Sequence, residues 1–242
     1  MSRITPAVTE AELAATIDHA ILKPELTRAE VDADLDVAAE WGVFSVCVRP
    51  SDIAHAVERL AGTAVAVGTV IGFPHGTTST ATKVAEVRQA LADGAVELDM
   101  VVNIGFLRSG MDDAVVDDIR AVVDAASGHV VKVILETSYL DDEQIARGSR
   151  LTEAGGAAFV KTSTGFAGGG ATLEHVRLMR ASVGPAVQVK ASGGVRSLDT
   201  ALAMLEAGAT RLGTSASATL LGELRAIEAG DGPTGARDES SY

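Results

Sequence analysis

The sequence repeats one pattern along almost its whole length: an apolar run of strand length is followed by a segment with helical periodicity. Four of the predicted helices end in a glycine that leads directly into the next apolar run: Gly42, Gly94, Gly155 and Gly208. Glycine readily adopts the left-handed conformation that ends a helix. Eight strand markers follow one another at intervals of 23 to 36 residues: Asp18, Cys47, Val70, Asp99, Leu135, Lys161, Lys190 and Gly213. Eight strand–helix units of this size are what a (β/α)8 barrel requires.

We therefore predict an α/β protein with a single (β/α)8 (TIM) barrel and a short N-terminal helix that begins at Glu10. The barrel domain is expected to span residues 1–230, and the polar tail, 231–242, is expected to be flexible. An open doubly wound sheet is the alternative, but no dinucleotide-binding fingerprint follows the first strand. Strands are expected at residues 18–22, 44–48, 63–71, 95–102, 129–135, 157–161, 186–190 and 211–213. Alternation along the fourth of these is expected to put Glu97, Asp99, Val101 and Asn103 on one face.

Composition excludes several classes of function. A net charge of −13 argues against non-specific binding to nucleic acid. No apolar stretch approaches the ~20 residues of a membrane span, and the N-terminal residues lack a signal-peptide pattern. Cys47 is the single cysteine, so no intramolecular disulfide can form. We expect a cytoplasmic protein that binds neither nucleic acid nor membrane.

Lysines mark the candidate site. Only five of the 20 basic residues are lysines, and three of these (Lys132, Lys161 and Lys190) lie inside apolar strand-like runs. A buried lysine is expensive unless it is paired with an acid or kept partly neutral. The carboxyl ends of the strands of a barrel meet at one mouth, where active sites lie. The strand ends bring six side chains to this mouth: Asp18, Cys47, Asp99, Thr137, Lys161 and Lys190.

Two lysines on adjacent strands suggest amine catalysis. An ordinary lysine, with a pKa of ~10.4, is protonated at neutral pH and cannot attack a carbonyl. A second ammonium ~4 Å away contributes about 4 kcal/mol of repulsion at an effective dielectric of ~20, which is a shift of roughly three pKa units. The alternative is that Asp18 and Asp99 pair with the lysines only to fill the barrel. Lys132 in particular could be such a layer-filling partner of Glu97 or Asp99.

Two glycine-rich turns predict a phosphate site. Gly193 and Gly194 follow the seventh strand, and the segment from Gly213 to Ser215 follows the eighth. The loops after these two strands form the usual phosphate site of this fold, because small residues let backbone N–H groups approach the anion. Arg196 is either a phosphate partner or a surface residue at the start of a helix.

The motifs at these positions resemble those of the deoxyribose-phosphate aldolases, which are class I aldolases on a TIM barrel. The resemblance covers about residues 10–225, and the two lysine motifs carry most of it. The matching segments are Ile17-Asp18-His19, Leu22-Lys23-Pro24, Ser45-Val46-Cys47-Val48, Gly72-Phe73-Pro74, 97–103 (ELDMVVN), 132–137 (KVILET), 160–165 (VKTSTG), 190–196 (KASGGVR) and 211–215 (RLGTS).

This resemblance implies reversible cleavage of 2-deoxy-D-ribose 5-phosphate to D-glyceraldehyde 3-phosphate and acetaldehyde. Lys161 is expected to form the Schiff base, Lys190 to lower its pKa, and Asp99 to act as acid and base. No metal or other cofactor is expected, because the iminium is the electron sink. The expected partners are a sugar phosphate and an aldehyde, with a homodimer as the expected assembly. The residues expected to bind substrate are Asp18, Cys47, Thr137, Thr164, Gly165, Gly193, Gly194, Arg196, Gly213 and Ser215.

Four positions depart from the pattern of that family: Arg49, His75, Ser138 and Phe166. Phe166 stands where a basic residue can help to hold phosphate, so phosphate contacts and substrate breadth stay open. Tyr242 could return to the barrel mouth as a proton shuttle or be the end of a solvated tail. Two other functions remain: a barrel aldolase that uses a ketose-phosphate donor, and a non-catalytic barrel that binds sugar phosphate.

Overall fold

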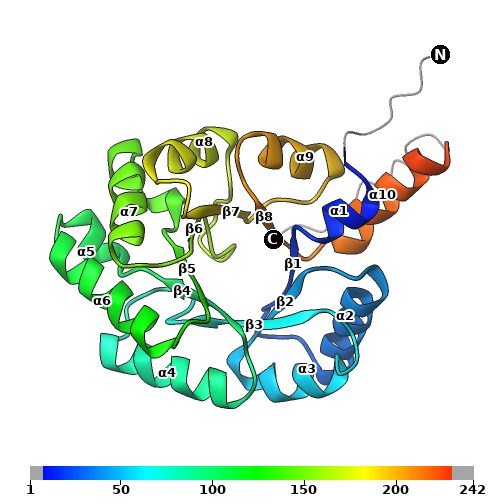
Figure 1. Ribbon diagram of the computed structural model, residues 1–242, viewed down its shortest axis with the longest axis horizontal. Helices are drawn as coiled ribbons and strands as arrows, with labels where there is room; N and C mark the ends of the chain where they lie inside the picture. The colour runs from blue at the N-terminus through cyan, green and yellow to red at the C-terminus, as the bar shows by residue number, and fades with distance from the viewer. Residues whose placement is uncertain (1–7, 231–242) are drawn as a thin grey trace.

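In the computed structural model, which describes residues 8–230, eight parallel strands close into a barrel in chain order (Figure 1). The predicted (β/α)8 barrel is confirmed. The predicted domain limits stay a prediction, and the expectations for residues 231–242, Tyr242 included, lie outside the described residues. The strands are β1 (Ile17–Ile21), β2 (Ser45–Val48), β3 (Ala66–Ile71), β4 (Glu97–Val101), β5 (Val130–Ile134), β6 (Phe159–Lys161), β7 (Gln188–Ser192) and β8 (Arg211–Thr214).

Helices form an outer ring around these strands (Figure 1). They are α1 (Glu10–Ala14), α2 (Arg28–Trp41), α3 (Ile53–Arg59), α4 (Thr80–Ala92), α5 (Ile104–Arg108), α6 (Asp112–Ala125), α7 (Asp142–Ala154), α8 (Leu173–Ser182), α9 (Leu198–Glu206) and α10 (Ser217–Ala229), with the 3-10 turns η1 (Pro50–Asp52) and η2 (Thr137–Tyr139). Among these helices, none is long and apolar enough to cross a bilayer.

The predicted N-terminal helix is confirmed as α1, which Thr9 and Glu12 open with a capping box. It lies beside α10 (Figure 1), where the guanidinium of Arg225 pairs with the carboxylate of Glu10 at 2.6 Å. Glu10 also donates its backbone N–H to the carboxylate of Glu228 at 3.1 Å. These contacts attach the start of the described chain to its last helix.

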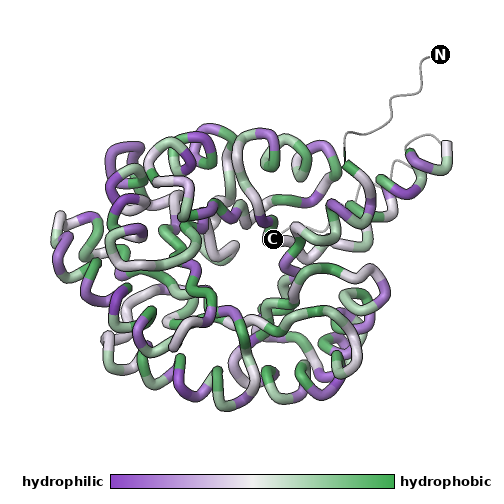
Figure 2. Tube along the Cα trace, viewed as in Figure 1, coloured by the Kyte–Doolittle hydropathy of each residue, from purple (hydrophilic) through white to green (hydrophobic). Residues whose placement is uncertain are grey.

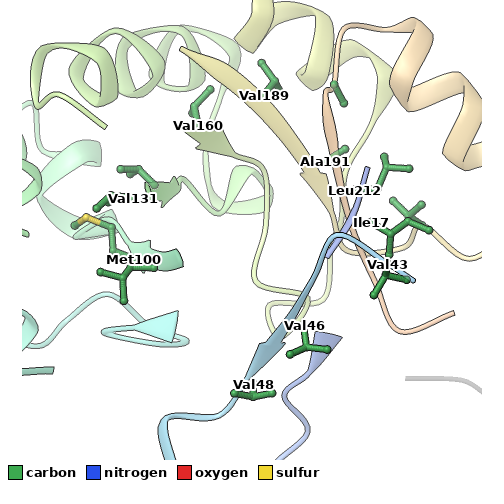
Figure 3. Packing of buried hydrophobic residues seen from close by; sticks show 14 of the residues in the cluster. Ile17, Val43, Val46, Val48, Met100, Val131, Val160, Val189, Ala191 and Leu212 are labelled. Atoms are coloured by element: carbon green, nitrogen blue, oxygen red, sulfur yellow. The ribbon is translucent and has the colours of Figure 1, made fainter. Parts of the chain in front are cut away.

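Alternation along the strands separates two buried regions. Successive side chains of a strand point to opposite faces, so Leu98 and Met100 face the helices while Glu97 and Asp99 face the barrel axis. The outward residues join one apolar cluster with the inner faces of the helices. Figure 3 shows residues of this cluster from several strands, among them Val46, Val160 and Leu212, and Figure 2 shows the matching mixture of hydrophilic and hydrophobic residues along the helices. The barrel axis, by contrast, is filled with charged side chains.

One helix departs from the sequence-based expectation. The sequence predicts a strand over residues 95–102 with Asn103 continuing its inward face, whereas the strand ends at Val101. Asn103 instead begins the short helix α5, and its side-chain oxygen accepts the backbone N–H of Phe106 at 3.1 Å. Asparagine favours this capping position because its side chain competes for backbone hydrogen bonds. The placement of Asn103 on the strand face was therefore wrong.

Candidate active site

Lys161 is the last residue of β6 and lies almost wholly inside the barrel, with 3% of its surface exposed. Its Nζ donates to Oδ2 of Asp99 at 2.7 Å. Burial lowers the pKa of Lys161, and the charge of Lys190 lowers it further, although Asp99 acts against both. The sequence predicts this pKa shift from the second ammonium alone, whereas burial contributes the larger share in the folded barrel.

Asp99 is the centre of the site. Lys132 donates to its Oδ1 at 2.8 Å, and Lys161 and Lys190 both donate to its Oδ2 at 2.7 Å. Burial alone would raise the pKa of Asp99, but the three ammonium groups hold it well below its usual range. Asp99 is therefore a carboxylate in contact with the candidate nucleophile.

Lys190, in β7, has the opposite electrostatic setting from Lys161. Its Nζ donates to Oδ2 of Asp18 at 2.5 Å as well as to Asp99. Burial acts to lower the pKa of Lys190, but Asp18 and Asp99 outweigh it and raise the pKa. Two adjacent lysines thus differ in charge preference: Lys190 stays an ammonium, whereas Lys161 is shifted toward the neutral amine that nucleophilic attack needs.

An ionic layer lies beneath these three residues. Lys132 bonds Glu97 at 2.7 Å in addition to Asp99, so both partners that its sequence position suggested are present. Arg211 pairs with Glu97 at 3.1 Å and also with Asp18. Its guanidinium lies 3.5 Å from the ring centroid of Phe44. Sequence reasoning missed Arg211, and the only signal was a charged residue at the start of an apolar run.

Asp18 belongs to this layer. Its Oδ1 accepts from Ser45 at 2.7 Å and from Arg211, and its Oδ2 accepts from Lys190. Burial opposes ionisation, but Lys132, Lys190 and Arg211 hold the pKa of Asp18 below its usual range. In the described structure Asp18 fixes the ammonium of Lys190. Its predicted contact with substrate stays a prediction.

Cys47 and Thr137 are buried near the site. Burial, together with the charge of Asp99, raises the pKa of the Cys47 thiol to about 11, so the thiol is neutral at neutral pH. This excludes the thiolate chemistry of activated cysteines and suits a wall residue. Thr137 begins η2, and its Oγ1 has no hydrogen-bond partner among the described residues.

A pocket of about 320 Å³ opens over the carboxyl ends of β3 to β6. Lys161 is not one of its lining residues, but Glu136, which lines it, is close enough to Lys161 for their charges to interact. Thr164, three residues after Lys161, forms part of its wall together with Glu136. Phe166 also lines this pocket, and its ring meets the ring of Phe73 edge to face at 5.2 Å between centroids. The residues lining the pocket are Pro74, His75, Thr77, Ile104, Gly105, Arg108, Glu136, Tyr139, Thr164, Phe166 and Ala167. Two departures from the family pattern, His75 and Phe166, thus share one pocket.

The predicted phosphate turns lie in another sector of the mouth, after β7 and β8. Gly193 and Gly194 have left-handed backbones (φ 83° and 80°), as does Gly165 after β6 (φ 85°). Such conformations are open to glycine at little cost and turn backbone N–H groups outward. Ser215 and Arg196 are exposed in the same sector.

Gly213 lies within β8 rather than in the turn that follows it. A Cβ there would lie 2.7 Å from Cβ of Ser192 and 3.2 Å from Cε of Lys190. A side chain at this position would therefore collide with Ser192 and crowd the end of the Lys190 side chain. No group of three or more His, Cys, Asp or Glu residues within 8–230 is placed to hold a metal ion.

Comparison with known proteins agrees with this geometry. The family model described as DeoC/LacD family aldolase matches residues 13–222. Deoxyribose-phosphate aldolase 1 of Staphylococcus aureus (strain MRSA252) is 56% identical over 210 residues, which is 87% of this chain and 96% of that protein. Deoxyribose-phosphate aldolase 2 of the same strain is 55% identical over 210 residues, with the same shares of both chains.

Among solved structures, the deoxyribose phosphate aldolase of Aeropyrum pernix has a TM-score of 0.82 at 32% identity, covering 90% of this chain and 93% of that one. A structure described as "QR15, an Aldolase" has a TM-score of 0.86 at 40% identity, covering 90% of this chain and 97% of that one. The match to the family model and the similarity in sequence and fold lead to one conclusion. The chain belongs to the DeoC/LacD family of aldolases.

Proposed function

We propose that this protein reversibly cleaves 2-deoxy-D-ribose 5-phosphate to D-glyceraldehyde 3-phosphate and acetaldehyde through a Schiff base on Lys161. One observation carries the proposal: Lys161 and Lys190 share a single oxygen of Asp99 but differ in the direction of their pKa shifts. The relatives named as deoxyribose-phosphate aldolases supply the substrate class.

The chemistry follows from this arrangement. The neutral amine of Lys161 attacks C1 of the open-chain sugar, and loss of water from the carbinolamine gives an iminium. The C2–C3 bond then breaks, its electron pair moves to the iminium to form an enamine, and the C3 hydroxyl loses its proton as glyceraldehyde 3-phosphate leaves. Protonation of the enamine at C2 and hydrolysis release acetaldehyde and free Lys161.

Asp99 is the group proposed to move protons in these steps. Its Oδ2 is in contact with Lys161 and with Lys190. A proton taken from the carbinolamine nitrogen can therefore be held by the Asp99–Lys190 pair and returned to the leaving hydroxyl. General acid–base catalysis requires such hydrogen-bond reach before any matching of pKa values.

The phosphate is proposed to bind the turns after β7 and β8. The left-handed Gly193 and Gly194 support this role, as does α10, whose first turn has no side-chain cap. Unpaired N–H groups at a helix start favour an anion. Gly165 and Ser215 complete the proposed phosphate site. The other residues proposed to line the substrate-binding region are Asp18, Cys47, Thr137, Arg196 and Gly213.

A coupled assay tests the reaction. Purified protein is mixed with deoxyribose 5-phosphate, and release of glyceraldehyde 3-phosphate is followed, with Lys161→Met as the matched variant. The proposal expects turnover by the wild type and a loss of at least ~1000-fold in the variant. In the synthetic direction, condensation with dihydroxyacetone phosphate as donor but not with acetaldehyde would replace this proposal with a ketose-phosphate aldolase.

We also propose a homodimer in the cytoplasm. The solved relative from Aeropyrum pernix is described as tetrameric, which supports self-association in the family. Cys47, the single cysteine, is a buried free thiol, in keeping with a reducing compartment. Light scattering coupled to gel filtration tests the assembly, and a monomer mass at micromolar concentration would contradict it.

A further inference from the structure

Glu136 has a strained backbone that is fixed directly beside the Lys161 strand. It follows β5 in the left-handed region (φ 59°, ψ 67°), which a non-glycine residue rarely adopts. The residues on either side are clamped: Leu135 donates its N–H to the carbonyl of Lys161 at 3.0 Å, and Thr137 donates its N–H to the carbonyl of Thr162 at 3.1 Å. Strain of this kind persists only where the surroundings over-determine it, often at a ligand site.

The hydroxyl of Thr164 is already committed to Glu136. Oε2 of Glu136 accepts the backbone N–H of Thr164 at 3.2 Å and also its Oγ1–H. Thr164 Oγ1 in turn accepts the backbone N–H of Phe166 at 3.0 Å. A hydroxyl has one hydrogen to give, so Thr164, which we predicted as a substrate-binding residue, has none left for a ligand.

The other carboxylate oxygen of Glu136 is the available one. Oε1 is buried and has no hydrogen-bond partner among the described residues, while Glu136 lines the pocket over β3 to β6 and interacts electrostatically with Lys161. Thr137 Oγ1 and Ser163 Oγ also have no partner there, but neither residue lines this pocket. A buried polar atom of this kind is costly unless a ligand satisfies it. A carboxylate oxygen accepts hydrogen bonds, so the ligand group must be a donor.

The position of Glu136 indicates which donor. The pocket lies over β3 to β6, the proposed phosphate turns lie after β7 and β8, and Lys161 lies between these two sectors. The loop after β6 joins the sectors, because Ala171 donates its N–H to the carbonyl of Gly193 at 2.9 Å. The same loop carries Thr164, which donates two hydrogen bonds to Glu136, so a sugar chain that leaves Lys161 along this loop passes the residue that holds the Glu136 carboxylate.

We propose that Glu136 is a specificity-determining residue whose Oε1 accepts a hydrogen bond from the hydroxyl next to the aldehyde carbon of the acceptor. The substrate class selected is thus the 2-hydroxyaldehydes, of which D-glyceraldehyde 3-phosphate is one. This inference rests on the proposed aldolase function. Thr164 then acts as a positioning residue, because its two hydrogen bonds fix the orientation of the Glu136 carboxylate.

Glu136→Gln tests the inference. The backbone and side-chain donors of Thr164 require an acceptor at Oε2, so the glutamine carbonyl takes that place and the amide NH2 takes the place of Oε1. The buried acceptor without a partner becomes a donor with little change in shape. Condensation with acetaldehyde is measured for two acceptors, glyceraldehyde 3-phosphate and its analogue without the 2-hydroxyl, 3-oxopropyl phosphate.

We expect kcat/KM of the variant to fall about tenfold or more with glyceraldehyde 3-phosphate and less than about twofold with 3-oxopropyl phosphate. Glu206→Gln, the same change at an exposed position on α9, is the matched control and should change neither value by more than about twofold. Equal losses for both acceptors, or none, would overturn the inference, as would selective loss in the Glu206 variant alone.

Two further measurements separate the possible failures. The wild type should itself favour glyceraldehyde 3-phosphate over 3-oxopropyl phosphate by about tenfold or more, a result that does not depend on a variant folding. Trapping of acetaldehyde on Lys161 by borohydride should persist in the Glu136 variant. An adduct with no discrimination between acceptors overturns this inference alone, whereas no adduct in the wild type overturns the aldolase function.

Discussion

At the scale of single residues, the site depends on an unequal pair of lysines. Lys190 has two carboxylate partners and remains charged, whereas Lys161 has one and is shifted toward the neutral amine. An amine that is partly neutral near pH 7 can attack a carbonyl without a separate base. The shared oxygen of Asp99 links the two groups, so a change to either should alter the titration of the other.

Lys190→Leu should move the pH dependence of adduct formation on Lys161 upward. The variant removes a positive charge that lowers the pKa of Lys161 and leaves Asp99, which raises it, in contact with Lys161 alone on Oδ2. The rate of acetaldehyde trapping by borohydride between pH 6 and 10 measures this, with Lys83→Met as a control outside the site. An unchanged profile would refute the proposed role of Lys190.

At the scale of elements, the loops decide function more than the strands do. The loop after β6 approaches the turn after β7 so closely that a Cβ on Gly170 would lie 2.3 Å from the carbonyl oxygen of Gly193. The shape of the barrel mouth therefore depends on backbone contacts between the loops of neighbouring strand–helix units. Such contacts join segments that are far apart in sequence, and no local pattern encodes them.

Gly170→Ala should weaken phosphate binding while leaving Schiff-base chemistry intact. The added methyl group must push the loop away from Gly193, since the atom it meets is backbone. We expect KM for deoxyribose 5-phosphate to rise about tenfold, with trapping of acetaldehyde on Lys161 within about twofold of the wild type. Gly222→Ala, where a Cβ meets only the Trp41 ring at 3.8 Å, is the control. Equal loss in both assays would contradict this account.

Variants of two buried ion pairs should distinguish an effect on stability from an effect on the reaction. Lys132 bonds Asp99 inside the barrel, whereas Lys83 on α4 bonds Asp118 at 2.6 Å and the carbonyl of Val101 at 2.8 Å between the strands and helices. Removing one partner of a buried pair costs about 3–5 kcal/mol. Lys132→Met and Lys83→Met should both lose stability of this order in urea unfolding.

Only the Lys132 variant should also change the pH profile of trapping on Lys161, because Lys83 touches no residue of the site. A shifted pH profile in the Lys83 variant, or an unshifted one in the Lys132 variant, would contradict this expectation. Either result would mean that the ion pair inside the barrel is not the one that sets the titration of Lys161.

The strands, most helices and the central charged residues could be predicted from the sequence, and the reason is physical. A lysine or aspartate in an apolar strand run has few explanations, so Lys161, Lys190 and Asp99 stand out. The alternation of β4 also placed Glu97 and Asp99 on one face correctly. Arg211 and Glu136 were missed because arginine at a strand start and glutamate after a strand end are ordinary on a solvated surface. Only the closed barrel buries them.

At the scale of the whole molecule, the ionic layer joins distant strands. It connects β1, β4, β5, β7 and β8 through Asp18, Glu97, Lys132, Lys190 and Arg211. Barrels of this kind are usually filled by branched apolar side chains. Here charged groups fill that space next to the site, so the same network that orients Lys161 also contributes to the pH dependence of folding.

The contribution of this ionic network to the free energy of unfolding should be lost to acid only below about pH 4. The folded-state pKa values of Asp18 and Asp99 lie below the unfolded value of ~3.9, so their stabilisation is present above that pH and is lost as pH falls through the folded values. The raised pKa values of Lys132 and Lys190 give stabilisation that is present below ~10.4 and lost only at higher pH.

Urea unfolding between pH 2 and 7 checks this expectation, with Asp99→Asn as the matched variant. The wild type should lose stability steeply below about pH 4, and the variant should show a shallower dependence. Identical slopes for the two proteins in that range would contradict the assignment of Asp99 as a buried carboxylate.

The central claim is that the amine of Lys161 forms the Schiff base. Incubation with acetaldehyde, reduction by borohydride and peptide mass spectrometry test it most directly, because reduction converts the iminium into a stable ethyl-lysine. We predict one ethyl group, on the peptide that contains Lys161, and none on the peptide that contains Lys190. Modification of Lys190 in place of Lys161, or no specific modification, would contradict the account.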